Sequence, residues 1–343
     1  MRKVVAVIVA KKVNIADIAN ALGLSRNTVS KALNGSSGIT SETRQRVLDQ
    51  AVRMNYKMMG TQVSKAKAIE ATNILLVCKD NQLVNAFFGP LILQLQHIVR
   101  SKGAIITMQY MSPEEIRDGV VPSQIHSASG VIGLEILDSD YIRSLIDCGK
   151  PCVFFDCAPD AEEISEAYDV VLQDERGLYV AIDLLFQRGY RRFGFVGDPG
   201  HCVGFRNRYE FFRLALADHG EFHPEQHSIL LPDDQMHQPG AYLKCLQSIE
   251  LPEVFVCAND MIACDLLKGM REGNMELSRE SGLVVFETSH DIVEEGKLLA
   301  SVNVGRKQIA SGLCMLLFDR MQNSAVGKRV VKLESVIDVC SPA

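Results

Sequence analysis

One stretch, Val13 to Tyr56, constrains the fold of this chain more than any other. Its first apolar residues recur at i, i+3, i+4 and i+7, which places them in one stripe on a short helix. These residues are Ile15, Ile18, Ala19 and Leu22. Gly23 then permits a tight turn, and Ser25 can cap a second helix by accepting a backbone N–H. The sequence therefore predicts two short helices joined by a glycine turn.

The second helix presents polar and apolar residues on opposite sides. At about 100° per residue, its polar side chains fall within an arc of about 140°. They are Arg26, Asn27, Ser30, Lys31 and Asn34, opposite Val29, Ala32 and Leu33. A bundle that merely packs needs no such cluster of donors, so we interpret the pair as a helix-turn-helix DNA reader. A third helix is expected to begin near Thr40 or Ser41.

The runs IADIANALGLSRNTVSKALNG and ITSETRQRVLDQAVRMNY resemble the DNA-binding headpiece of the LacI/GalR family, which includes the lac and purine repressors. The resemblance implies a headpiece over residues 12–56 that binds double-stranded operator DNA. Asn27 can pair with adenine, and Arg26 or Lys31 with guanine, so these three are the expected base-reading residues. The residues expected to hold the DNA backbone are Asn14, Ser25, Thr28, Ser30, Asn34 and Tyr56.

Charge is divided unevenly along the chain. Residues 1–67 carry twelve Lys or Arg against three Asp or Glu, whereas the remainder carries 24 against 39. A basic head on an acidic body suits a nucleic-acid-binding module joined to a part that avoids the phosphate backbone.

The ten cysteines are scattered without a C-x-x-C motif, and we expect reduced thiols in a cytoplasmic protein. There is no apolar stretch of transmembrane length. We treat residues 1–11 as an N-terminal extension, because their short apolar run is followed at once by the headpiece.

Residues 57–71 form a basic linker without clear apolar periodicity. In the LacI/GalR family this segment forms a hinge helix that inserts a leucine into the minor groove. Here Lys65 stands where we count that leucine, and no proline follows Tyr56 closely. Lys57, Lys65 and Lys67 are expected to hold phosphates instead.

From residue 72 onward, short apolar runs alternate with helical stretches, which predicts parallel sheets covered on both faces. We expect an all-α helix-turn-helix headpiece joined to an α/β core of two Rossmann-like lobes. The resemblance implies a periplasmic-binding-protein-like core whose chain crosses between lobes near residues 165, 302 and 328. The first lobe would hold about 72–165 and 303–328, and the second about 166–302 and 329–343.

In open α/β sheets, ligands bind beyond the carboxyl ends of the strands. Six residues near such ends stand where the resemblance places effector contacts, with Glu287 where relatives carry Asp, although Phe87 or Phe88 could equally cap the core. They are Phe87, Phe88, Asp156, Arg208, Asn259 and Glu287. We expect Asn259 to contact the ligand and Asp260 to be only a helix cap. Acidic acceptors, an arginine, an amide and an aromatic face suit a small polar, carbohydrate-derived ligand.

Enzyme chemistry has no motif behind it. The chain lacks G-x-S-x-G, P-loop, H-E-x-x-H and G-x-G-x-x-G patterns, so we expect no catalytic residues and no cofactor. His219, His223 and His227 have metal-site spacing, but Gly220 and Pro224 break the helix this would need, and no metal is expected.

The sequence thus predicts a homodimeric transcription regulator, expected to be a repressor, that reads a near-palindromic operator. No heptad tail follows the last predicted strand, which favours a dimer. An effector between the lobes would change operator affinity. The alternative from another class is a solute-binding or sensor protein with a vestigial head.

Overall fold

The computed structural model describes residues 14–33, isolated residues between 39 and 54, and then 72–79, 87–163, 168–220, 223–236, 238, 240–278, 281–288, 290–323 and 327–340. The chain divides into two compact units between residues 70 and 71. The expected positions of Asn34, Tyr56, Lys57, Lys65 and Lys67, the N-terminal extension and the linker lie outside the described residues. No helix in the described part is long and apolar enough to cross a membrane.

The first unit contains α1 (Ile15–Leu22) and α2 (Arg26–Leu33). Asn14 caps α1 through a capping box with Asp17, and Gly23 ends the helix in the left-handed region at φ 66°. Ser25 Oγ accepts the Thr28 backbone N–H at 3.0 Å. Ile18, Ala19, Val29, Ala32 and Val47 form a small buried core. The expected helix, glycine turn and helix are confirmed.

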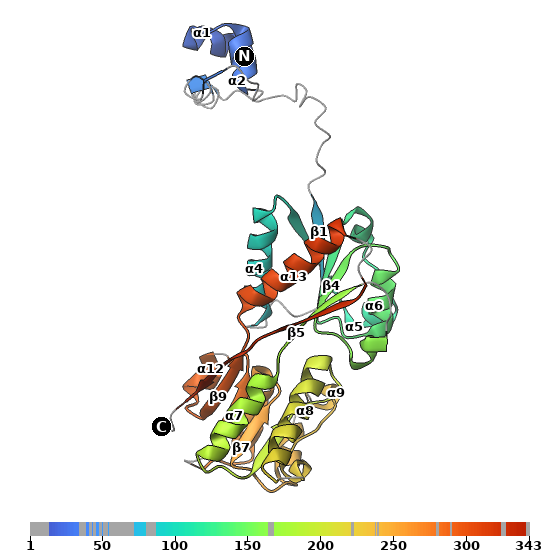
Figure 1. Ribbon diagram of the computed structural model, residues 1–343, viewed down its shortest axis with the longest axis vertical. Helices are drawn as coiled ribbons and strands as arrows, with labels where there is room; N and C mark the ends of the chain where they lie inside the picture. Colours follow the sequence, from blue (N-terminus) through green and yellow to red (C-terminus); the bar gives the residue numbers. More distant parts are fainter. Residues whose placement is uncertain are drawn as a thin grey trace, which may run out of the picture. The chain divides into compact units, whose positions relative to one another are not determined.

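The first sheet of the second unit has, among the described residues, six parallel strands in the order β10-β5-β4-β3-β1-β2. Its strands are β1 (Asn73–Lys79), β2 (Ile105–Met111), β3 (Gly130–Leu134), β4 (Cys152–Phe155), β5 (Asp169–Gln173) and β10 (Arg329–Leu333). Helices α4 (Phe88–Ser101) and α13 (Arg306–Gln322) cover one face, and α5 (Pro113–Arg117) and α6 (Ser139–Ile146) lie on the other (Figure 1). Alternate β1 residues enter the two cores, as the period of a strand requires.

The second sheet has, in the described ranges, five strands in the order β11-β9-β8-β7-β6. They are β6 (Phe193–Val196), β7 (Val254–Cys257), β8 (Gly282–Phe286), β9 (Leu298–Asn303) and β11 (Val336–Val339). The strands are parallel except β11, which pairs antiparallel with β9. The helices of this lobe are α7 (Arg176–Gln187), α8 (Val203–Asp218), α9 (Asp233–Met236), α10 (Ala241–Leu246), α11 (Asp260–Glu272) and α12 (His290–Glu294).

The chain crosses between lobes at places that correct two of the expected boundaries. β5 pairs with β4, so the first crossing follows Gln173 instead of lying near residue 165. β10 pairs with β5, so the last crossing follows Leu333 instead of lying near 328. The middle crossing falls between β9 and α13, close to the expected residue 302. Strand β5 is buried throughout, and the sequence of such a strand does not indicate which of the two sheets it joins.

A buried ionic cluster fixes β10 beside β5. The Asp169 carboxylate at the start of β5 is fully buried and accepts bonds from Arg320 at 2.6 and 2.8 Å and from Arg329 at 2.8 and 2.9 Å. Removing one partner of such a buried pair leaves an uncompensated charge, so the cluster holds β10 and α13 in the first lobe. All ten cysteines are free thiols.

Candidate effector cavity and nucleic-acid interface

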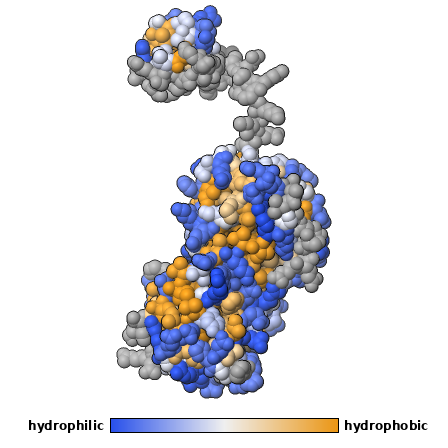
Figure 2. All heavy atoms as spheres, viewed as in Figure 1, coloured by the Kyte–Doolittle hydropathy of each residue, from blue (hydrophilic) through white to orange (hydrophobic). Residues whose placement is uncertain are grey.

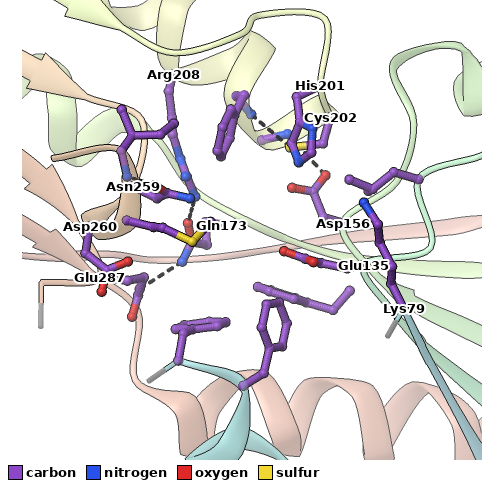
Figure 3. Close-up of a pocket in the computed structure, with 18 residues that line it drawn as sticks. Lys79, Glu135, Asp156, Gln173, His201, Cys202, Arg208, Asn259, Asp260 and Glu287 are labelled. Atoms are coloured by element: carbon purple, nitrogen blue, oxygen red, sulfur yellow. Dashed lines mark hydrogen bonds between the residues drawn. The ribbon is translucent and has the colours of Figure 1, made fainter. Parts of the chain in front are cut away.

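A cavity of about 230 Å³ lies at the carboxyl ends of the strands and draws its lining from both lobes (Figure 3). Its size is near the lower end of the ~300–1,000 Å³ usual for small-molecule sites. The first lobe contributes Lys79, Phe87, Phe88, Glu135, Leu137, Phe155, Asp156 and Gln173. The second contributes His201, Cys202, Gly204, Phe205, Arg208, Asn259, Asp260, Met261, Ile262 and Glu287. All six residues expected at an effector site are in this lining.

Phe87 and Phe88 belong to the first lobe's core and also face the cavity. They are 8% and 5% exposed. Their rings meet edge to face at 5.0 Å, and Phe87 stacks on Phe155 at 5.9 Å. The two roles left open by the sequence are therefore combined, because one face of the pair packs inward while the rest forms an apolar wall.

Three carboxylate residues directly follow parallel strands with positive φ. Glu135 follows β3 at φ 54°, Asp156 follows β4 at 61° and Glu287 follows β8 at 55°. Residues other than glycine rarely adopt this region, which costs about 1–3 kcal/mol and clusters at functional sites. The strained turns aim three acidic side chains at one cavity. The sequence reasoning missed Glu135, although it follows the run GVIGL as Asp156 follows CVFF.

Gln173 joins two residues of the opposite lobe at the floor of the cavity (Figure 3). Its Oε1 accepts from the Arg208 guanidinium, and its Nε2 donates to Glu287 Oε1 at 2.8 Å. Arg208 also donates to the Ala258 carbonyl at 2.5 Å and lies over the Phe286 ring at 4.3 Å. The guanidinium is thereby fixed by a carbonyl, an amide and a ring.

Two buried glutamates share this environment. Burial raises the pKa of Glu287 to about 7, and the negative charge of Asp260 adds to the rise. The hydrogen bond from Val304 N and the nearby Arg208 and Arg306 lower this pKa and offset part of the rise. Burial likewise raises the pKa of Glu175 to about 7, partly offset by Arg208. Glu175 is fully buried, and neither of its carboxylate oxygens accepts a hydrogen bond. The cavity lining therefore holds one carboxylate, Glu287, that readily gains or loses a proton near neutral pH, and Glu175 is a second such group outside the lining.

Asp156 bridges the lobes at the N-terminus of α8. Its Oδ1 accepts from Gly204 N at 3.1 Å and from Cys157 N at 2.8 Å. A Cβ at Gly204 would lie 2.5 Å from Asp156 Oδ2, so the approach needs glycine. Val203 N also donates to the Cys157 carbonyl at 2.9 Å. To accept a ligand hydroxyl as expected, the Asp156 carboxylate must serve both the ligand and this bridge.

Asn259 and Asp260 both line the cavity, but Asn259 and not Asp260 is the helix cap. Asn259 is the N-cap of α11, because its Oδ1 accepts from Ile262 N at 2.8 Å. Asp260 is the first helical residue and lines the cavity. The cap therefore takes the Asn259 acceptor oxygen, and the carboxylate that sequence reasoning dismissed is part of the site.

Sequence reasoning also missed Lys79, Gln173 and His201 in the lining. Lys79 and Gln173 end strands β1 and β5, so their positions carried a signal. His201 lies in the turn before α8, where the sequence pattern gave no signal.

The three histidines with metal-site spacing contact separate partners, Asp183, Glu225 and the Glu250 carbonyl. No metal cluster is found among the described residues.

The outer face of α2 carries the expected base-reading residues. Arg26, Asn27 and Lys31 are exposed, while Val29 and Ala32 on the opposite side are buried. The helix is thus amphipathic in the sense that a major-groove reader requires. Asn14 and Ser25, expected on the DNA backbone, cap α1 and α2, and Thr28 and Ser30 are half-buried.

Two family descriptions match the chain. "Bacterial regulatory proteins, lacI family" matches residues 14–58, and "Periplasmic binding protein-like domain" matches residues 182–338. The transcriptional repressor MelR of Bacillus subtilis is 25% identical over 335 residues, spanning 93% of this chain and 94% of MelR. The regulator GalR of Lacticaseibacillus casei is 25% identical over 334 residues, spanning 94% and 96%.

Solved structures share the fold. The regulator CelR in complex with cellobiose matches with a TM-score of 0.67 and 21% identity over 96% of this chain and 99% of CelR. The lac repressor dimer bound to operator and an anti-inducer matches with a TM-score of 0.65 and 16% identity over 97% and 99%. With a lacI-type headpiece, a periplasmic-binding-protein-like core and repressors as relatives along nearly its whole length, this chain belongs to the LacI family of DNA-binding transcriptional regulators.

Proposed function

We propose that this protein is a homodimeric cytoplasmic repressor whose operator affinity is set by a small polar, sugar-type effector in the cavity. The single observation that carries the proposal is the lining of that cavity by polar residues of both lobes. A ligand held by Asp156 on one side and Arg208 and Glu287 on the other favours one angle between the lobes. Such a change can alter the spacing of two DNA-binding heads.

Relatives support the ligand class. The related CelR is described in complex with cellobiose, and the lac repressor was solved as a dimer on its operator. In this chain the aromatic wall of Phe87 and Phe88 offers a face for a sugar ring, and Asp156 and Glu287 offer hydroxyl acceptors. The size of the cavity favours a monosaccharide-sized ligand.

Exposed apolar side chains support a self-association surface. Figure 2 shows apolar residues gathered in the region of α13. Met315 on α13 and Val293 on α12 are 59% and 56% exposed. Patches of this kind mark interaction sites more often than single exposed residues do. A dimer would place two α2 helices in successive major grooves about one helical turn apart.

The proposal is tested by selecting bound sequences from a random duplex pool at two salt concentrations, with and without a pool of sugars. We expect a near-palindromic site whose binding weakens steeply with salt, because phosphate contacts release counterions. Recovery that depends on the sugar pool would support the effector. No recovered motif under any condition would contradict the repressor and favour a sensor protein with a vestigial head.

We propose that Arg26, Asn27 and Lys31 read base edges and that Asn14, Ser25, Thr28 and Ser30 set the register on the backbone. The operator selected above supplies the duplexes on which single variants of these residues can be compared base by base.

A further inference from the structure

Carboxylates outnumber cations around the cavity. Among the described lining residues, Glu135, Asp156, Asp260 and Glu287 face only two side-chain cations, Lys79 and Arg208. Figure 3 shows the acids on two sides, with Glu135 and Asp156 near Lys79 and with Asp260 and Glu287 on the side of Arg208. Each wall therefore holds two carboxylates and one cation. A concave site lined by an excess of one sign concentrates ligands of the opposite sign.

Part of the arginine is already committed to the chain itself. Its NH1 and NH2 groups donate to the Ala258 carbonyl and the Gln173 amide oxygen, while its Nε–H is buried without a hydrogen-bond partner. Its charge is also opposed by buried Glu175, whose carboxylate oxygens have no hydrogen-bond partner. A carboxylate or phosphate ligand would find only the remaining N–H groups of this one guanidinium and would still meet four acids. The cavity disfavours an anion.

The remaining choice is between a neutral ligand and a cation. Asp260 and Glu287 repel one another, since each like charge disfavours ionisation of its neighbour. A positive group between such carboxylates relieves that repulsion, which a hydroxyl cannot do. Aromatic rings on the same cavity, Phe87, Phe88, Phe155 and Phe205, also interact favourably with a cation over their faces.

Resting on the function proposed above, we infer that the effector is a cationic sugar-type molecule: a monosaccharide-sized polyol that carries one protonated amine. The amine would lie against the carboxylates beside α11, Asp260 and Glu287, and the hydroxyls would take the remaining acceptors. Neutral sugars of the same shape would bind more weakly, and acidic ones more weakly still.

The test compares matched sugars on the full-length protein by titration calorimetry at low ionic strength. Each series holds one ring in three forms: glucosamine, glucose and glucuronate, and galactosamine, galactose and galacturonate. We expect an amine to bind about tenfold or more tightly than its neutral partner, a difference of about 1.4 kcal/mol. The advantage should shrink as salt rises, because screening weakens the attraction.

Two variants locate the effect. Asp260→Asn keeps the shape of the wall but removes one charge, so it should weaken the amine's binding several-fold more than the neutral sugar's. The control is Glu250→Gln, an exposed glutamate outside the cavity, which should change neither.

Tighter binding of a neutral or acidic sugar in every series that binds would overturn the inference while leaving a sugar-type effector in place. An equal loss of amine and neutral sugar in Asp260→Asn would also overturn it. Binding by none of the six compounds would count against the inference and the sugar class together, whereas the operator selection would still decide whether the protein reads DNA.

Discussion

The polar side chains on the outer face of α2 and those in the cavity differ in exposure and in hydrogen bonding. Arg26, Asn27 and Lys31 on α2 are exposed. In the cavity, Arg208 is only 7% exposed and donates to the chain itself, and Glu287 accepts from Gln173 and from Val304 N at 2.5 Å. DNA can therefore meet donors that are ready to bind, whereas an effector must replace bonds that the protein already makes.

This difference separates the energetics of the two regions. An exposed lysine or asparagine adds little to folding, and its value appears only on DNA. A buried arginine or glutamate contributes to folding as well as to ligand binding. Removing it leaves a buried partner without a hydrogen bond, which costs the full desolvation energy of that partner. Substitutions in the head should change binding alone, and substitutions in the cavity should change stability and binding together.

The largest contrast is expected for Arg208→Met. The change removes the donor to the Gln173 amide oxygen and one of the two cations facing each of Glu175 and Glu287, so we expect a loss of about 3–5 kcal/mol in the free energy of unfolding. Urea titration of the full chain measures it. Arg213→Met on the same helix is the control, since that side chain is 54% exposed, has a 3.8 Å ion pair with Glu210 and lies 5.8 Å from the centre of the Tyr209 ring. Similar losses in both variants would contradict the special role of Arg208.

The head should show the reverse behaviour in Lys31→Ala. We expect a loss of about 1–3 kcal/mol in operator binding that falls mainly at one base position. The unfolding free energy should change by less than about 0.5 kcal/mol, because the side chain is exposed. Binding assays on single-base variants of the selected operator measure the first quantity. A uniform loss on all duplexes would make Lys31 a phosphate contact.

These two substitutions also mark what the sequence could predict. The head was predictable because its cap, turn and stripe are local: Ser25, Gly23 and Ile18 act within one or two turns. For the cavity, the sequence predicted only that its residues follow the ends of strands. Its floor depends on Gln173 contacting Arg208 and Glu287 on another lobe, which are distant in sequence. The first crossing was misplaced because a strand buried on both faces carries no mark of the sheet it joins.

The cavity, unlike the head, should make stability depend on pH near neutrality. Glu175 and Glu287 have folded pKa values of about 7, above the usual unfolded value near 4.3. The folded state therefore holds more protons between these values, and stability falls as pH rises from about 4.5 to about 7. Below the unfolded pKa the contribution is complete, and above about 7 it is lost.

We expect each group to contribute on the order of 2 kcal/mol across that window. The charged groups facing Glu287 are Arg208, Arg306 and Asp260, and those facing Glu175 are Arg208, Asp156 and Lys332. Glu287→Gln should remove its share of the slope between pH 5 and pH 7.5 in urea titrations. An unchanged slope in that variant would mean that Glu287 ionises as an ordinary surface glutamate does.

The smallest expected effect concerns the bridge between the lobes. Gly204→Ala would put a Cβ 2.5 Å from Asp156 Oδ2, so that carboxylate must turn away and release the Gly204 N–H. Because a side chain can move more cheaply than a backbone, we expect a loss of only about 1 kcal/mol. Gly312→Ala in α13 is the control, since its Cβ would meet ordinary contacts at 3.7 Å, and it should be neutral or stabilising. The informative readout is effector binding: if Asp156 is shared between the bridge and the ligand, the alanine variant frees its carboxylate and should bind the effector at least as tightly despite its lower stability. Weaker binding would instead show that the hydrogen bond between Gly204 N and Asp156 holds this carboxylate in the orientation that binds the effector, so that the bond assists the ligand instead of competing with it.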